Sequence, residues 1–143
     1  EITSLSNLAT LNYTLGDYSL AETMYLEAIA LKRELFGRNT EQYAASVLNL
    51  ATLYDAIGQY EQAEPLYLEG LEIDKQLFGD EHPYYAMDLH NLAALYVHMG
   101  NYDKAEPLYR QAIELKKKVM GTEHRSYAST YRLVFAVLQY KRQ

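Results

Sequence analysis

Apolar residues recur at intervals of three and four along most of the chain. In residues 45–57, Val47, Leu50, Tyr54 and Ile57 follow this spacing, which places them on one face of an α-helix. Short alternating segments with turn residues every few positions would indicate strands, and none is visible. The pattern therefore predicts an all-α chain.

Glycine and proline mark where the predicted helices end and begin. Gly58 follows the helix just described, in a place where a left-handed backbone costs little. A second helix is predicted over about 60–77, with Pro65 in its opening turns, where a missing N–H is tolerated. Gly79 ends this helix and Pro83 starts the next one. Each helix is expected to be roughly 22 to 27 Å long, and each pair of helices is expected to form an antiparallel hairpin.

The hairpin pattern repeats with a period of 42 residues. "NLATL" at 7–11 returns as "NLATL" at 49–53 and "NLAAL" at 91–95. Two successive windows of 42 residues share 19 identities. Because no hairpin can bury its apolar face alone, the hairpins must stack to form a core. We expect one domain over residues 1–143, as a segment of a larger protein, with repeats at about 1–40, 41–82 and 83–124 and an unpaired last helix at about 125–141.

Small residues at repeated positions are expected to allow close packing of the helices. Ala63 and its counterparts 42 residues away lie where the second helix approaches the first. Gly70 and its counterparts, Ala28 and Ala112, are expected to admit the backbone of the next hairpin.

The spaced motifs "NLAxLY", "GxYxxAEPLY" and "FGDEHP" resemble the tetratricopeptide repeat, and in particular its 42-residue variant in kinesin light chains. The resemblance covers nearly the whole chain and implies a right-handed α-solenoid of about seven helices. Asn12, Thr23 and the segment "RLVFAVL" depart from the pattern. These departures make the ends atypical, which suits capping units and an arbitrary segment boundary equally. The matching residues are Leu50, Ala51, Tyr54, Gly58, Tyr60, Ala63 and Tyr67.

Charge and composition narrow the class of partner. The formal net charge of −6 argues against nucleic acid and anionic membranes, because phosphate binding needs clustered Lys and Arg. We interpret the one basic run, "LKKKV" at 115–119, as the solvated face of a helix end rather than a phosphate site. The absence of cysteine removes disulfides and thiolate chemistry. No apolar run is long enough for a membrane span, and we expect a cytoplasmic location.

The four histidines are the residues with which an enzymatic function would have to begin. His82 and His124 lie one repeat apart in the turns between hairpins, which favours a turn or capping role. His90 and His98 are eight residues apart on one helix, too far to share a metal directly. No catalytic motif such as HExxH or GxSxG is present. We expect no enzymatic activity, no metal and no cofactor.

The asparagine that opens each "NLA" motif is the residue that packing explains least. Asn49 is rotated by about 100° from Leu50, so it lies at the edge of the buried stripe. In the tetratricopeptide fold the first helices line the inside of the superhelix. The resemblance therefore implies that Asn7, Asn49 and Asn91 form a ladder along a concave groove, where amides can pair with a peptide backbone. An alternative is that each amide bonds a neighbouring helix. Further groove positions implied by the resemblance are Ser6, Thr10, Leu48, Thr52, Asp55, Met87, His90 and Arg132.

The favoured function is a non-enzymatic module that binds a short peptide segment of a protein partner in this groove, with Asp55, His90 and Arg132 tuning specificity. The carboxylate clamp that holds chaperone tails in some members of this family is not expected, because only Asn49 agrees with its pattern. The alternative is a structural or regulatory array that packs on an effector domain of the same parent. Such an array could also self-associate through the helix at 125–141.

Overall fold

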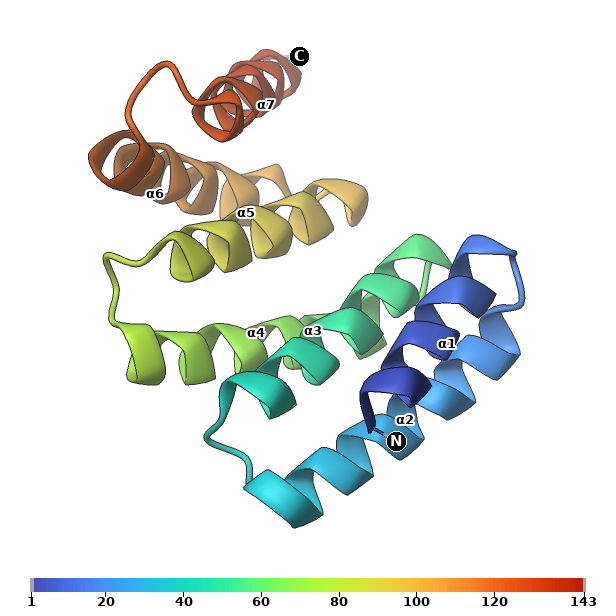
Figure 1. Ribbon diagram of the computed structural model, residues 1–143. Helices are drawn as coiled ribbons and strands as arrows, with labels where there is room; N and C mark the ends of the chain where they lie inside the picture. The colour runs from blue at the N-terminus through green and yellow to red at the C-terminus, as the bar shows by residue number, and fades with distance from the viewer. Residues whose placement is uncertain (1, 143) are drawn as a thin grey trace. The chain divides into compact units, whose positions relative to one another are not determined.

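A computed structural model describes the backbone of residues 2–142 and the side chains of residues 7–142. Within these residues the chain forms seven α-helices and no strand, which confirms the all-α prediction (Figure 1). The helices are α1 (Ile2–Thr14), α2 (Tyr18–Phe36), α3 (Glu41–Ala56), α4 (Tyr60–Phe78), α5 (Pro83–His98), α6 (Tyr102–Met120) and α7 (Arg125–Lys141).

Side-chain caps start several of the helices. The Thr40 hydroxyl accepts a hydrogen bond from the Tyr43 amide at 3.2 Å and caps α3. The φ angle of 84° at Gly58 is left-handed, as predicted for the residue after a helix. The helix α4 begins at Tyr60 as predicted, and Pro65 stands inside it, beyond the first four residues whose N–H groups have no helical partner. Its missing N–H leaves the carbonyl of the exposed Glu61 without the usual donor four residues later.

The chain divides into two compact units, with the boundary inside α4. The N-terminal unit extends through Ile73 and the C-terminal unit begins at Asp74. The N-terminal unit has a core cluster in which Tyr43 and Val47 of α3 pack with Ile73 of α4. Partly buried Ile29 of α2 packs against the same cluster.

Gly70 makes room for a contact within its own hairpin, and the expected approach of the next hairpin stays a prediction. A Cβ placed on Gly70 in α4 would lie 2.5 Å from both Cγ and Cδ2 of Leu48 in α3. Such an approach is too close for any side chain to be added without movement. The small residue therefore makes room for a leucine of the preceding helix of the same repeat.

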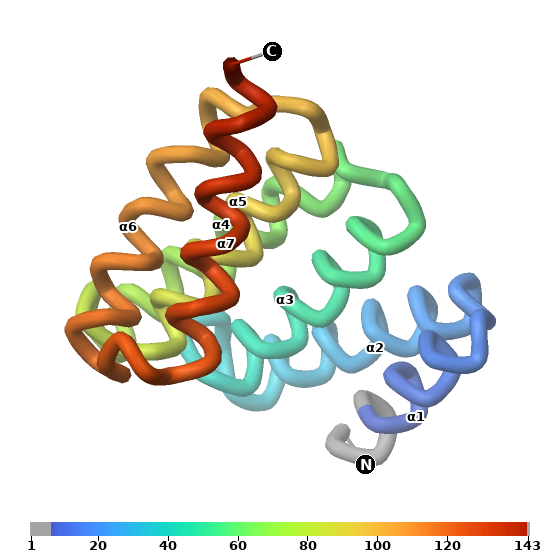
Figure 2. The backbone as a smooth tube through the Cα atoms, turned by 90° about the horizontal axis from the view of Figure 1, so that it is seen from above, coloured from blue at the N-terminus to red at the C-terminus, as the bar shows by residue number. Residues whose placement is uncertain are grey.

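The C-terminal unit contains α5, α6 and α7. In Figure 2, α6 runs away from the chain terminus and α7 returns beside it in the opposite direction. Its core includes Leu89 and Leu95 of α5, Tyr109 of α6, and Val134 of α7, all at most 7% exposed. Tyr131, Phe135 and Tyr140 of α7 are exposed.

Candidate functional site

The asparagine amides are available for a ligand in both units. In the N-terminal unit Asn7 and Asn49 are exposed, and in the C-terminal unit Asn91 is half-buried. None of the described residues forms a hydrogen bond with the side-chain amide of Asn49 or Asn91. The described contacts therefore give no support to the alternative in which these amides tie helices together.

The hydroxyl groups predicted for the groove of the N-terminal unit bond within their own repeats. Thr10 Oγ1 lies 3.0 Å from the Tyr25 hydroxyl, and one repeat later the Tyr67 hydroxyl donates to Thr52 Oγ1 at 3.5 Å. Tyr67 also donates to Asp55 Oδ2 at 3.4 Å. Burial, together with the Asp55 carboxylate, raises the pKa of Tyr67 to about 12. These side chains fasten the first helix of a repeat to the second.

Two predicted groove residues have other surroundings. Leu48 is half-buried and faces Gly70, so its side chain contributes to packing within the hairpin. Arg132 is exposed on α7 and does not line the cavity described next. The side chain of Ser6 lies outside the described residues.

Three predicted residues meet at one cavity of the C-terminal unit. Met87, His90 and Asn91 of α5 line a space of about 350 Å³. The opposite wall comes from α6 and from the start of α7. The residues that complete the lining are Lys116, His124, Arg125, Ser126 and Ser129.

A buried lysine reaches this cavity. Lys116 is only 3% exposed, and its Nζ donates to Thr130 Oγ1 at 2.8 Å. The same hydroxyl lies 2.8 Å from His90 Nδ1, and the ammonium is 3.4 Å from that nitrogen. The Thr130 hydroxyl also donates to the Ser126 carbonyl at 3.0 Å. All polar partners of Lys116 in the described part of the chain are thus uncharged side chains.

Burial dominates the electrostatics of this cluster. It lowers the pKa of Lys116, and burial together with the Lys116 charge lowers the pKa of His90 to about 4. The imidazole is therefore neutral at neutral pH. The Tyr109 ring, edge-on to His90 with the centroids 5.4 Å apart, fixes the other side of the imidazole.

The interpretation of the basic run as a solvated face is wrong for Lys116. Lys117 and Lys118 are exposed as expected, whereas Lys116 is buried. A signal for this was present in the sequence, because Ala105, Tyr109 and Lys116 belong to one helical stripe with intervals of three and four through position 112. The two exposed lysines that follow Lys116 made this buried position hard to recognise in the sequence.

The histidines in the turns act as helix caps. Nδ1 of His82 accepts from the Tyr84 amide at 3.0 Å, and Nδ1 of His124 accepts from the Ser126 amide at 3.0 Å. Among the described residues, no group of three or more His, Cys, Asp or Glu side chains is arranged to hold a metal ion.

In α4, the residue one repeat before Lys116 is an acid. Asp74 and Asp88 stand one repeat before Lys116 and Thr130, and each is 5% exposed. Oδ2 of Asp88 is buried without a hydrogen-bond partner among the described residues. Burial, a hydrogen bond with Asp74 and the Asp74 charge raise the pKa of Asp88 to about 9. Asp88 therefore carries a proton at neutral pH.

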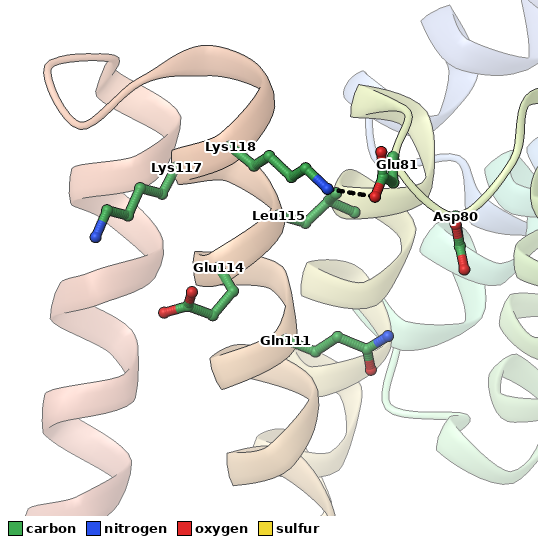
Figure 3. Close-up of a pocket in the computed structure, with 7 residues that line it drawn as sticks. All are labelled: Asp80, Glu81, Gln111, Glu114, Leu115, Lys117 and Lys118. Carbon is green, nitrogen blue, oxygen red and sulfur yellow. Dashed lines mark hydrogen bonds and ion pairs between the residues drawn. The ribbon is translucent and has the colours of Figure 1, made fainter.

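A larger recess of about 560 Å³ lies beside α6 near the turn before α5 (Figure 3). Lys118 reaches across it to Glu81, and the two side chains are 60% and 63% exposed. Glu114 and Lys117 point away from this pair, toward α7. Surface ion pairs of this kind add little free energy. We regard the recess as a solvated surface feature and the cavity at Lys116 as the stronger site.

A family profile of the tetratricopeptide repeat matches residues 1–76, 43–118 and 87–134. The chain belongs to the tetratricopeptide repeat family. The family is a non-catalytic repeat scaffold, and its repeats make this chain a protein–protein interaction module. A comparison with curated proteins gives no match.

Solved structures share the fold. BtubC (BKLC) from P. vanneervenii has a TM-score of 0.89 at 24% identity, over 96% of this chain and 55% of that one. The kinesin light chain nearly identical TPR-like repeats of Podosopora anserina also have a TM-score of 0.89 at 24% identity, over 99% of this chain and 67% of that one. PcrH in complex with the chaperone binding region of PopD has a TM-score of 0.72 at 22% identity, over 97% of this chain and 92% of that one.

These likenesses confirm the α-solenoid fold of tetratricopeptide type. The chain spans little more than half of the length of BtubC, at 55%. No helix among the described residues has the length and apolar character that crossing a membrane requires.

Proposed function

We propose that this tetratricopeptide module binds a short peptide segment of a protein partner along the first helices of its repeats. The observation that carries the proposal is the meeting of Asn91, Met87 and His90 at one cavity. An amide with no hydrogen-bond partner among the described residues, an apolar side chain and a neutral imidazole suit an extended peptide, which needs backbone pairing and side-chain pockets.

A structural neighbour supports this proposal. PcrH has the same fold and was solved in complex with the chaperone binding region of PopD, a segment of another protein. The corresponding role for this chain, in a cytoplasmic setting, is part of the proposal.

The experiment is a selection of binders from a random peptide library displayed on phage, with the whole chain as bait, followed by calorimetry on synthetic peptides. Replacement of Asn49 and Asn91 by alanine removes two amides. Each lost hydrogen bond costs about 1 kcal/mol, or about fivefold in Kd. Asn39→Ala is the matched control, because Asn39 is exposed in a turn. If the double variant bound selected peptides as tightly as the unchanged chain and Asn39→Ala, the amide groove would be refuted.

A second candidate function is self-association through α7. Tyr131 and Phe135 are each 56% exposed, and a cavity of about 420 Å³ opens between α6 and α7. An exposed apolar face of this kind marks an interaction site. We propose a second copy as the occupant, because the same patch on two copies can pair around a twofold axis.

Light scattering at several concentrations tests the second candidate. The apparent mass should rise with concentration, and Phe135→Glu should abolish the rise while circular dichroism stays unchanged. A constant monomer mass at every concentration would remove self-association.

A further inference from the structure

We propose that the cavity at Lys116 takes the carboxylate of an Asp or Glu side chain from the bound peptide, while the Asn91 amide pairs with the adjacent peptide backbone. This inference rests on the proposed peptide-binding function and adds the charge of one anchor residue. It concerns the C-terminal unit alone.

The ammonium group of Lys116 has no counter-ion among the described residues. Lys116 is 3% exposed and touches a hydroxyl and an imidazole, and no described carboxylate bonds to it. Burying a charge without a counter-ion costs several kcal/mol. The chain has 19 acidic residues and a net charge of −6, so acids are plentiful elsewhere. A carboxylate from a ligand would supply the charge that is missing here.

The described residues that line the cavity include no acid. Around Lys116 stand the guanidinium-bearing Arg125, the imidazole of His124 and the hydroxyl-bearing Ser126 and Ser129. These groups offer positive charge and hydrogen-bond donors. An anionic group entering the cavity therefore meets donors on several sides.

The volume of the cavity fits one side chain of a peptide. About 350 Å³ is close to the lower limit of ligand pockets, which is roughly 300 Å³. Such a space suits one side chain and the backbone next to it. Asn91 lies on the same wall as Met87, so backbone pairing and the anchor carboxylate can be served together.

The other repeats show which residues the position of Lys116 accepts. Position 116 corresponds to Asp74 one repeat earlier and to Lys32 two repeats earlier. The repeats hold either an acid or a lysine at this position, so the fold itself does not require a cation at position 116.

Lys116→Met and Lys117→Met form a matched pair for the test. Both remove one positive charge, but only Lys116 is buried beside the cavity. Peptides are selected from a displayed random library on the unchanged chain and on each variant. The unchanged chain and Lys117→Met should select an acidic residue at one fixed position, whereas Lys116→Met should lose this preference.

Synthetic peptides complete the test without relying on a variant. Glu→Gln at the selected position should weaken binding to the unchanged chain about tenfold or more, and should change little with Lys116→Met. Inorganic phosphate and acetate serve as free-anion probes. Thermal stabilisation of the unchanged chain by either ion, combined with no acidic preference in the peptides, would identify a small-anion site and overturn the proposal.

The remaining outcomes are separable. Selected peptides without an acidic position overturn this inference and leave peptide binding standing. Failure to select any peptide overturns the proposed function and this inference with it. An equal loss on Glu→Gln with Lys116→Met overturns the assignment of Lys116 as the counter-ion.

Discussion

Gly70→Ala is a sensitive test of how the second hairpin packs. In an isolated helix alanine is more favourable than glycine by about 1 kcal/mol. In α4 the new Cβ would lie 2.5 Å from Leu48 Cγ and Cδ2, and no side chain accepts such a contact without moving. Overpacking of this kind costs about 1–3 kcal/mol. We expect the variant to be less stable than the unchanged chain by about 1 kcal/mol.

The same change should have the opposite sign when Leu48 is already alanine. Leu48 is half-buried, so Leu48→Ala alone should cost less than the roughly 2–5 kcal/mol of a fully buried leucine. With the leucine truncated, the three atoms nearest to the new Cβ are gone, and the alanine introduced by Gly70→Ala gains its helix propensity of about 1 kcal/mol. The coupling between the two sites should therefore reach about 2 kcal/mol.

Urea unfolding followed by circular dichroism measures all four members of this cycle. The reasoning fails if Gly70→Ala stabilises the otherwise unchanged chain, or if the two substitutions are additive. Either outcome would mean that Leu48 turns aside at no cost and is free to face a ligand, as the sequence suggested.

Two further predictions concern the buried acid and a cap. Burial and Asp74 raise the pKa of Asp88 to about 9, so folding takes up a proton at pH values between about 4 and 9. The contribution of the protonated Asp88 to the free energy of unfolding is therefore full below about pH 4. It declines as the pH rises toward 9, by up to about 1.4 kcal/mol per pH unit. Asp88→Asn should flatten this decline in urea unfolding at several pH values; an unchanged slope would contradict the assignment. Thr40→Ala should cost about 1 kcal/mol by removing the cap on the Tyr43 amide. Thr40→Ser should restore most of this loss, and equal destabilisation by both variants would speak against capping.

The helices and their period could be predicted because their signals are local. The spacing of Leu50 and Tyr54, and the glycine that follows each of the first six helices, depend on neighbours within one or two turns. Capping by His82 and His124 was also foreseeable, since both lie between hairpins.

The candidate site was only partly foreseeable because its contacts are distant in sequence. His90 meets Thr130 across 40 residues, and Lys116 joins them from a third helix. The sequence contained the helical stripe that buries Lys116, but two exposed lysines beside it concealed the signal. The groove role of Leu48 came from resemblance alone, and the side chain turned out to pack on Gly70.

Two positions, one near the end of the second helix of a repeat and one near the start of the next helix, carry a different pair of polar residues in each repeat. One period apart, they hold Lys32 and Ser46, then Asp74 and Asp88, then Lys116 and Thr130. Excising residues 41–82 would bring the Lys32 position against the Asp88 position and turn an acid pair into an oppositely charged pair. A shortened chain would then join its hairpins through a junction that the full chain never makes. The pair of residues at these two positions differs from hairpin to hairpin, so the repeats of this chain cannot be exchanged without changing the polar contacts at the junctions.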